Sequence, residues 1–227
     1  MATRLFIHST DPALTARMDP KVRWQIEQRQ RKLKASLESR LNRLRTVTLE
    51  IGCGHGHFLT AYAERFPEEF CVGIDVNRLR IERAVIKADR SQVKNLWFLC
   101  AEAMEFLKFL PGTVKLGKIW ILYPDPWPKK KHLKNRIIQE DFLKALAEVC
   151  QSSAKLHIKS DQAGFMEWTR ELILASDEWR PCRPQALPEV ATTVFQTLTR
   201  GKSFEMTAKL ARISHKIRSE RTEVECG

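Results

Sequence analysis

An acidic residue, a tryptophan and a run of basic residues come together between Trp120 and Arg136. The segment begins with a continuous apolar run typical of a buried strand, after which Asp125 and Trp127 alternate with prolines. The prolines are Pro124, Pro126 and Pro128. Each proline fixes φ and removes a backbone donor, so the turn can be neither a helix nor a central strand and should be nearly rigid. A rigid acid followed by five Lys or Arg side chains and one His predicts a catalytic or binding loop that faces a polyanion.

A second candidate binding segment is the glycine-rich run Gly52-Cys53-Gly54-His55-Gly56-His57. Glycines at every second position let the backbone approach a ligand closely and turn tightly into a following helix. A dinucleotide-binding loop would read Gly-x-Gly-x-x-Gly, and from Gly52 its last glycine would fall on His57. The pattern therefore argues against a nicotinamide cofactor and leaves another nucleoside-containing ligand open.

Acidic residues stand at or just beyond the ends of the predicted strands. They are Glu50, Asp75, Glu102, Asp125 and Asp161. Ligands of parallel sheets bind beyond the carboxyl ends of the strands, and Asp75 has the spacing from Gly52 at which an acid reaches ribose hydroxyls. S-adenosylmethionine has a ribose, an amino group and a positive sulfonium, all of which suit an acidic rim. The glycines and acids together predict S-adenosylmethionine as the cofactor.

These residues need a scaffold of alternating strands and helices. Apolar runs predict strands over 46–51, 70–75, 95–100 and 118–123, and an alternation of apolar and polar residues predicts a fifth strand over 154–160. Helical spacing and caps predict helices over 21–45, 58–66, 77–89, 137–149 and 162–175. A proline-rich loop should follow Trp179, and β-like runs at 194–198 and 204–211 suit an antiparallel pair at the sheet edge. The alternation predicts a mostly parallel, seven-stranded α/β sheet with helices on both faces. We expect an N-terminal extension over 1–45 and a main domain over 46–227.

Composition narrows the possible partners. The formal charge of +12 favours a polyanion, with nucleic acid as the first candidate. No apolar run approaches the roughly 20 residues that span a bilayer, and the first residues do not resemble a signal peptide, so no membrane association is expected. Six cysteines without a Cys-x-x-Cys pair indicate buried thiols in a reducing compartment, and we expect a cytoplasmic protein. The basic helix over 21–45 is either a solvated surface or a phosphate-gripping face.

Three motifs carry a family resemblance. They are Glu50-Ile-Gly-Cys-Gly-His-Gly-His-Phe, Gly73-Ile-Asp-Val and Tyr123-Pro-Asp-Pro-Trp-Pro-Lys-Lys-Lys-His. Over residues 46–211 the chain resembles the bacterial tRNA (guanine-N7-)-methyltransferases, and the proline turn is the most specific of the motifs. The resemblance implies a Rossmann-like class I methyltransferase that transfers a methyl group from S-adenosylmethionine to N7 of a guanine in tRNA, at position 46 of the variable loop.

The resemblance also implies roles for individual residues. It places the cofactor against Glu50, Gly52, Gly54, Gly56, Asp75 and Glu102, with Asp125 as the cofactor-adjacent catalytic acid. It places the substrate against Lys129, Asp161, Thr193 and Gln196. It implies RNA contacts by the basic segment, at Lys131, His132, Lys134 and Arg136.

The chain departs from the family pattern at three places. The family motif Thr-x-Phe-Glu reads Thr193-Val-Phe-Gln196 here, so an amide replaces the acid. The acid-Ala pair after the third strand is Glu102-Ala103, with Glu in place of the commoner Asp. The loop between Gln196 and Phe204 is also several residues shorter than in the family. These departures bear on base binding and not on the type of reaction.

The residues themselves suggest how such a reaction proceeds. Guanine N7 carries a lone pair and no proton, so its attack on a methyl group needs no general base. Positioning can supply on the order of 7–11 kcal/mol of the barrier, which a proline-fixed loop is suited to provide. A carboxylate can accept from guanine N–H groups and stabilise the positive charge as it moves to the base. We therefore predict that Asp125 orients the base and stabilises charge, and that it is not a base.

Several alternatives stay open. Trp127 either fills the core below the turn or stacks on a base, and the lysines after it either contact phosphate or are solvated. His55 and His57 form a His-x-His pair without a third ligand nearby, so no metal is expected.

A DNA amino-methyltransferase is one rival function. Such an enzyme would carry Asp-Pro-Pro-aromatic, whereas here the aromatic stands one residue early. A non-catalytic RNA-binding protein with the same fold is the other rival. The sequence decides neither which tRNAs are modified nor between a monomer and a homodimer.

Overall fold

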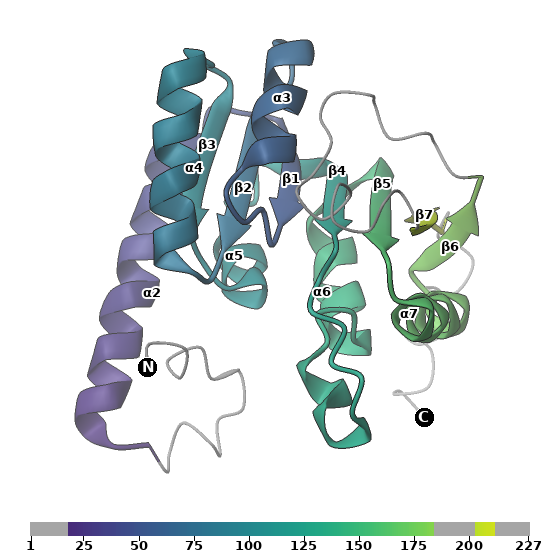
Figure 1. The fold of residues 1–227 in the computed structure, drawn as a ribbon. Coiled ribbons are helices and arrows are strands. Elements are labelled where there is room, and N and C mark those ends of the chain that lie inside the picture. The colour runs from purple at the N-terminus through teal and green to yellow at the C-terminus, as the bar shows by residue number, and fades with distance from the viewer. Residues whose placement is uncertain (1–17, 184–202, 212–227) are drawn as a thin grey trace, which may run out of the picture.

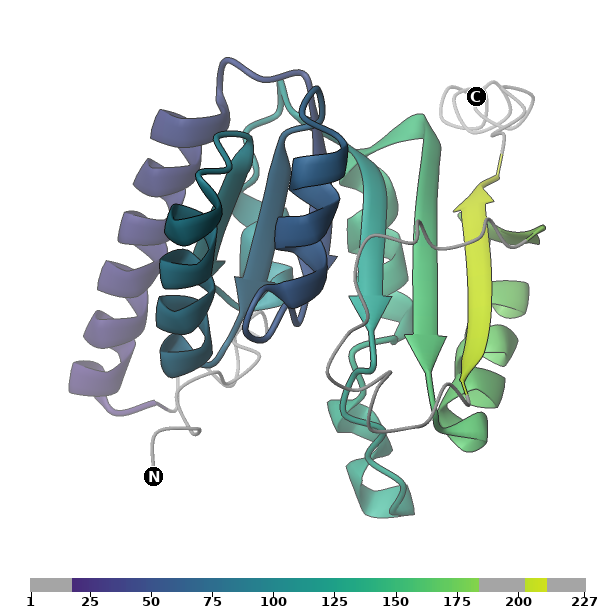
Figure 2. The same ribbon diagram turned by 45° about the horizontal axis from the view of Figure 1, so that its top comes forward.

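The computed structural model describes residues 18–183 and 203–211, which form one seven-stranded sheet between two layers of helices (Figure 1, Figure 2). The strands are β1 (Thr46–Ile51), β2 (Cys71–Asp75), β3 (Leu96–Cys100), β4 (Lys115–Leu122), β5 (Cys150–Ser160), β6 (Trp179–Cys182) and β7 (Phe204–Leu210). The helices are α2 (Pro20–Leu41), α3 (His57–Arg65), α4 (Arg78–Ser91), α5 (Ala103–Phe109), α6 (Glu140–Val149), α7 (Ala163–Ala175) and the 3-10 helix η1 (Lys130–Asn135).

The sheet has the strand order β3-β2-β1-β4-β5-β7-β6. Strands β1 to β5 pair in parallel, and β7 runs antiparallel to both β5 and β6. The predicted fold class is therefore confirmed. The order reverses between β1 and β4, and in open α/β sheets ligands bind at such a switch point.

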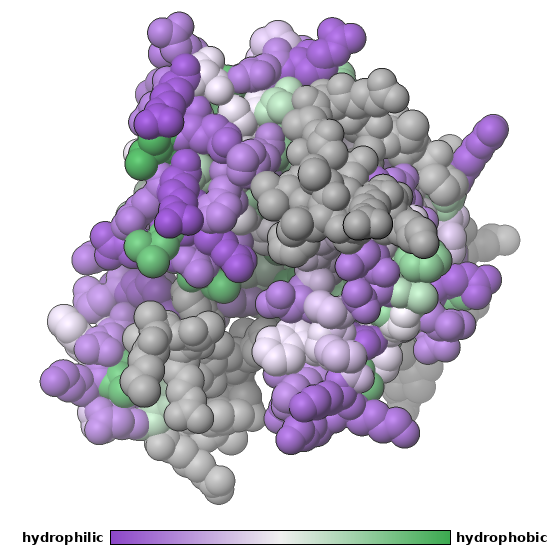
Figure 3. Space-filling view, in the orientation of Figure 1, coloured by the Kyte–Doolittle hydropathy of each residue, from purple (hydrophilic) through white to green (hydrophobic). Residues whose placement is uncertain are grey.

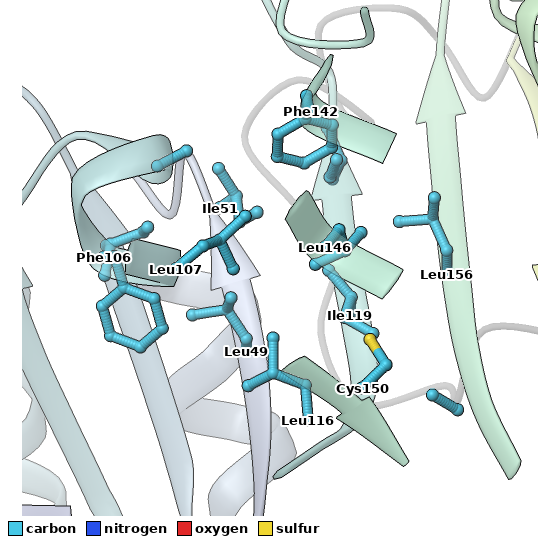
Figure 4. Packing of buried hydrophobic residues seen from close by; sticks show 14 of the residues in the cluster. Leu49, Ile51, Phe106, Leu107, Leu116, Ile119, Phe142, Leu146, Cys150 and Leu156 are labelled. Carbon is cyan, nitrogen blue, oxygen red and sulfur yellow. The ribbon is translucent and has the colours of Figure 1, made fainter. Parts of the chain in front are cut away.

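Two apolar clusters hold the helices against the sheet. On one face, Phe58 of α3 and Ile81 of α4 pack with Phe98 and Trp120 of the strands. On the other face, helices α2, α5, α6 and α7 contribute to a larger cluster, in which Leu49, Ile119, Phe142 and Leu146 lie between the central strands and α6 (Figure 4). Burying one such side chain contributes roughly 1.5–3 kcal/mol, so these clusters stabilise the strands that position the site.

Helix α2 is joined to this larger cluster. Asp19 caps it by accepting from the backbone N–H groups of Lys21 at 2.8 Å and Val22 at 3.4 Å, and Pro20 occupies its first turn. A stripe of buried side chains, Leu33, Leu37 and Leu41, then packs into the core. The basic side chains of the helix lie outside this stripe. Within the described residues, no helix is both long enough and apolar enough to cross a membrane.

The edge of the sheet differs from the prediction. The proline-rich segment after Trp179 was expected to be a loop, but Trp179–Cys182 forms β6, and β6 is the strand that pairs with β7. Pro181 is tolerated there because an edge strand leaves one row of backbone groups unpaired. Residues 194–198, the partner predicted for β7, lie outside the described residues.

Two short elements were not predicted. Helix α5 has only 7 residues, too few to show a helical period, and η1 lies within the basic run after the proline turn. The predicted boundaries of the other helices differ by a few residues, as when α6 begins at Glu140 instead of 137.

Candidate functional site

A cleft of about 420 Å³ opens at the carboxyl ends of the parallel strands. All but one of the residues predicted to bind the cofactor line it: Glu50, Gly52, Gly54, Asp75, Glu102 and Asp125. The remaining one, Gly56, is not part of the lining but ends the glycine loop at the start of α3. The structure thus gathers side chains from the ends of four strands into one cavity.

The glycine loop is fixed by its own backbone. All three glycines have positive φ, with values of 76° at Gly52, 55° at Gly54 and 69° at Gly56. A Cβ at Gly56 would also lie 2.5 Å from the ring of Phe98, so this position excludes every other residue. The N–H groups of Gly52 and Cys53 donate to the carbonyl of Ile74 at 2.8 and 3.0 Å, which ties the loop to β2.

Asp75 orients its carboxylate through the same loop. It is 5% exposed and accepts from the backbone N–H of Gly54 at 3.0 Å and of Asn77 at 2.7 Å. The guanidinium of Arg80 lies 3.7 Å from it. Sequence reasoning did not single out Arg80, although its place in the first turn of the helix after Asp75 was a usable signal. These contacts hold the Asp75 carboxylate at the cleft wall.

Glu50 is the most unusual group in the cleft. It is 4% exposed, and burial together with repulsion from Asp75 raises its pKa to about 8. A hydrogen bond with the Leu59 backbone acts in the opposite direction and lowers the pKa. Among the described residues, its Oε2 has no hydrogen-bond partner. A buried acceptor without a donor costs roughly 1–3 kcal/mol, which is typical of a group that awaits a ligand.

Glu102 has a structural contact as well as a place in the cleft. It is the N-cap of α5, and its carboxylate accepts from the backbone N–H of Glu105 at 2.9 Å. A cap of this kind holds the side chain in one orientation at the end of β3.

The proline turn presents Asp125 at the rim of the cleft. The N–H of Tyr123 donates to the carbonyl of Lys159 at 2.7 Å, so the β4 ladder continues up to the turn. Tyr123 and Trp127 then have left-handed φ values of 51° and 40°, a conformation that costs non-glycine residues about 1–2 kcal/mol each. Asp125 is exposed between them. Trp127 is half-buried in the cleft wall, with its ring edge-on to His132 at 5.5 Å.

The basic segment divides into two kinds of residue. The side chains of Lys129, Lys130, Lys131 and Lys134 are exposed. Arg136 is only 8% exposed, and its guanidinium donates from Nε to the carbonyl of Pro126 at 2.8 Å and from Nη1 to that of Gly164 at 3.4 Å. The RNA contact predicted for Arg136 does not fit this burial, because the side chain instead joins the proline turn to α7.

The residues predicted to bind the substrate are only partly described. Lys129 and Asp161 are both exposed and lie outside the lining of the cleft, and Asp161 accepts from the side chain of Gln162 at 3.2 Å. Thr193 and Gln196 lie outside the described residues. A search of the described residues for three or more His, Cys, Asp or Glu side chains that could hold a metal found no such group.

Comparison with known proteins defines the family. Residues 44–214 match a family model whose description reads "Putative methyltransferase". The chain belongs to this methyltransferase family. The methyltransferase is 38% identical over 122 residues to the tRNA (guanine-N(7)-)-methyltransferase of Magnetococcus marinus, over 54% of this chain and 48% of that protein. It is 34% identical over 152 residues to the enzyme of the same name from Halorhodospira halophila, over 66% of this chain and 65% of that protein. The chain thus spans about half to two thirds of the length of these relatives.

The fold also matches solved structures. The methyltransferase superposes on the 16S rRNA methyltransferase KamB with a TM-score of 0.54, at 18% identity, over 78% of this chain and 92% of that one. At this identity the likeness concerns the fold alone.

Proposed function

We propose that this methyltransferase transfers a methyl group from S-adenosylmethionine to N7 of a guanine in tRNA. The observation that carries the proposal is that one cleft contains two kinds of acidic group. The same cleft is lined by Glu50, a buried carboxyl whose Oε2 has no hydrogen-bond partner among the described residues, and by Asp125, a proline-fixed acid that leads into exposed lysines. The relatives named as tRNA (guanine-N(7)-)-methyltransferases support the choice of base and RNA.

The residues of the cleft suit this cofactor. Bound S-adenosylmethionine supplies an electrophilic methyl group on a positively charged sulfur. Glu50 has a buried acceptor that could receive a cationic N–H donor, and Asp75 is held where a carboxylate can accept from two ribose hydroxyls. A Cβ at Gly52 or Gly54 would meet no atom within 4 Å, so the space beside the backbone is open to a ligand. Glu102, which lines the same cleft, would also contact the cofactor.

Asp125 would act on the base. It is exposed at the rim, so it can accept from the N–H groups of an incoming guanine and hold N7 towards the methyl group. N7 has no proton to lose, so the carboxylate need not take one. Its charge would stabilise the positive charge that the base acquires. Half-buried Trp127 would form one wall for the base.

The RNA would extend from the cleft over the exposed lysines. Lys131 and Lys134 carry charge into solvent on η1 and would contact phosphates, with His132 held beside them against Trp127. Lys129 and Asp161 would contact the nucleotide next to the target guanine, and Thr193 and Gln196 would complete the substrate site. We propose the guanine at position 46 of the variable loop as the target.

The test is transfer of a radiolabelled methyl group from S-adenosylmethionine to bulk tRNA, followed by digestion to nucleosides. Label in 7-methylguanosine supports the proposal. Label in DNA would favour an amino-methyltransferase, and RNA binding without transfer would favour a non-catalytic RNA-binding protein. Asp125→Asn should abolish most of the transfer, whereas Glu171→Gln, which removes an exposed carboxylate from α7, should leave it unchanged.

A further inference from the structure

A second group of basic side chains lies on the opposite side of the glycine loop from the lysines of η1. The side chains are His55 and His57 of the loop and Arg83 and Lys87 of α4. Arg83 Nη1 lies 3.5 Å from His55 Nε2, and Lys87 Nζ lies 3.0 Å from His57 Nδ1. Arg83 and Lys87 are one helical turn apart, so both face the loop from the same side of α4.

This cluster has no acidic counterpart. Within the described residues, no carboxylate forms an ion pair with Arg83 or Lys87. Since an ammonium can only donate, Lys87 donates to His57, which accepts through Nδ1. Burial and the charge of Lys87 accordingly lower the pKa of His57. Arg83 and Lys87 thus lie against histidine rings, without a carboxylate partner among the described residues, and an incoming anion would stabilise their charge.

The position of the cluster indicates how large its ligand must be. His55 and His57 line the cleft, whereas Arg83 and Lys87 do not. A carboxylate on a small ligand inside the cleft would meet only the histidines. Arg83 is exposed and lies outside the lining of the cleft, so an anion that contacts it must continue outside the cavity.

The opposite side of the cleft has the matching charge. Helix α4 and η1 lie on either side of the glycine loop and proline turn (Figure 1). Figure 3 shows hydrophilic surface over both elements, with exposed apolar side chains of α4, among them Leu79 and Ile86, between its charged ones. A polyanion that placed one nucleotide in the cleft could therefore contact cations on both sides.

We propose that His55, His57, Arg83 and Lys87 form a binding site for a backbone phosphate of the RNA substrate, on the side of the cleft opposite η1. The inference rests on the proposed function. Arg83 and Lys87 supply the charge, and the histidines hold these side chains in place. The RNA would be gripped on both sides of the target nucleotide, which fixes its position over the cleft.

The test compares two double variants of equal charge. Arg83→Gln/Lys87→Gln removes the cluster. Arg65→Gln/Lys94→Gln removes the same two residue types from exposed positions at the end of α3 and before β3, near the amino ends of the strands and away from the cleft. Binding of a fluorescein-labelled, unmodified tRNA transcript is measured by anisotropy over a range of salt concentrations, and S-adenosylmethionine binding by calorimetry. Circular dichroism melting checks that both variants fold.

The cluster variant should bind the transcript about tenfold or more weakly at low salt, and the slope of log K against log salt should fall by about one per lost phosphate contact. The control should retain wild-type values, and neither variant should lose cofactor affinity. Equal losses in both variants, or wild-type tRNA binding by the cluster variant, would overturn the proposal. Lost cofactor affinity with intact tRNA binding would assign the cluster to the cofactor instead. If the wild-type protein itself bound no tRNA, the proposed function would fail, not this inference alone.

Discussion

Glu50 places an ionisable group where its charge state should control ligand binding. The side chain is nearly buried, its Oε2 lacks a partner among the described residues, and Asp75 repels its ionised form. A cationic ligand would favour the ionised carboxylate and an empty cleft the neutral acid. The same residue should therefore link pH to cofactor affinity and to stability.

The first prediction concerns S-adenosylmethionine affinity. Because the pKa of Glu50 in the free protein is raised to about 8, binding of a cationic cofactor should strengthen as pH rises towards this value and level off above it. Below the pKa the gain should approach tenfold per pH unit. Calorimetry from pH 6.5 to 9 measures the affinity for S-adenosylmethionine. The Glu50→Gln variant is the control, because any pH dependence that remains in it comes from titration of the cofactor. A constant ratio of wild-type to Glu50→Gln affinity across this range would contradict the role of Glu50.

The second prediction concerns stability without cofactor. Since folding raises the Glu50 pKa from 4.5 to about 8, the folded state holds the proton more tightly, and the stability due to this proton is fully present below pH 4.5 and lost as pH rises to about 8. Glu50→Gln has no such titration. Its free energy of unfolding relative to wild type should rise by about 1.4 kcal/mol per pH unit over this range. Urea denaturation at pH 5 and pH 8 measures the change, and an identical difference at both values would count against it.

The third prediction concerns Asp125. If this carboxylate orients the base and stabilises charge, Asp125→Asn should lower kcat for tRNA methylation by about 10²–10³-fold and leave the shape of the pH profile unchanged. Binding of S-adenosylmethionine should be retained. The role assigned to Asp125 would be wrong if the variant lost cofactor binding while its residual complex still transferred methyl groups at the normal rate in a single turnover.

At the scale of elements, the proline turn depends on a residue distant from the acid it presents. Arg136 follows η1, yet its guanidinium returns to the carbonyl of Pro126 and lies over the rings of Phe165 and Trp168, at 5.7 and 5.4 Å from their centres. The turn is thereby fixed to α7 as well as to β4. Its two left-handed residues are held by contacts at both ends.

The fourth prediction separates this structural role from an RNA contact. Arg136→Ala should destabilise the protein by about 1–3 kcal/mol, because it removes charged hydrogen bonds and stacking from a buried position. Lys134→Gln, a nearby exposed change on η1, should leave the melting temperature unchanged but reduce the salt dependence of tRNA binding. Thermal melting and anisotropy measure the two effects. If Arg136→Ala were as stable as wild type and only weakened RNA binding, the structural role would be refuted.

The burial of Arg136 also shows where sequence reasoning stops. The first four parallel strands were predictable from their apolar runs and the fifth from its alternation of apolar and polar residues. The cleft residues were predictable because they stand at or just beyond the ends of these strands. Arg136 was indistinguishable from its basic neighbours, since only tertiary contacts with α7 separate it from Lys134. Likewise β6 was not predicted because it contains Pro181. A proline argues against a central strand but not against an edge strand. Helix α5 was too short to show a period.

At the scale of the whole molecule, the net charge of +12 is distributed so that cations lie on both sides of the cleft. Lys130 and Lys131 are exposed near the proline turn, and Arg83 and Lys87 lie beyond the glycine loop. An RNA that contacts only one side could pivot, whereas an RNA that contacts both is held over Asp125. Both groups of cations should therefore contribute to the same bound state.

The fifth prediction tests this arrangement with a double-mutant cycle. Lys130→Gln/Lys131→Gln and Arg83→Gln/Lys87→Gln act on separate elements with no shared partner, so their losses of tRNA-binding free energy should add to within about 0.5 kcal/mol if one RNA contacts both sides at once. If RNA instead bound to either side in turn, removing one side would leave the other mode intact, and the combined loss would greatly exceed the sum. Anisotropy titrations of the wild type, both double variants and the quadruple variant measure the cycle. Additivity would mean that both groups of cations contribute to the same bound complex, each by its own share of the binding free energy.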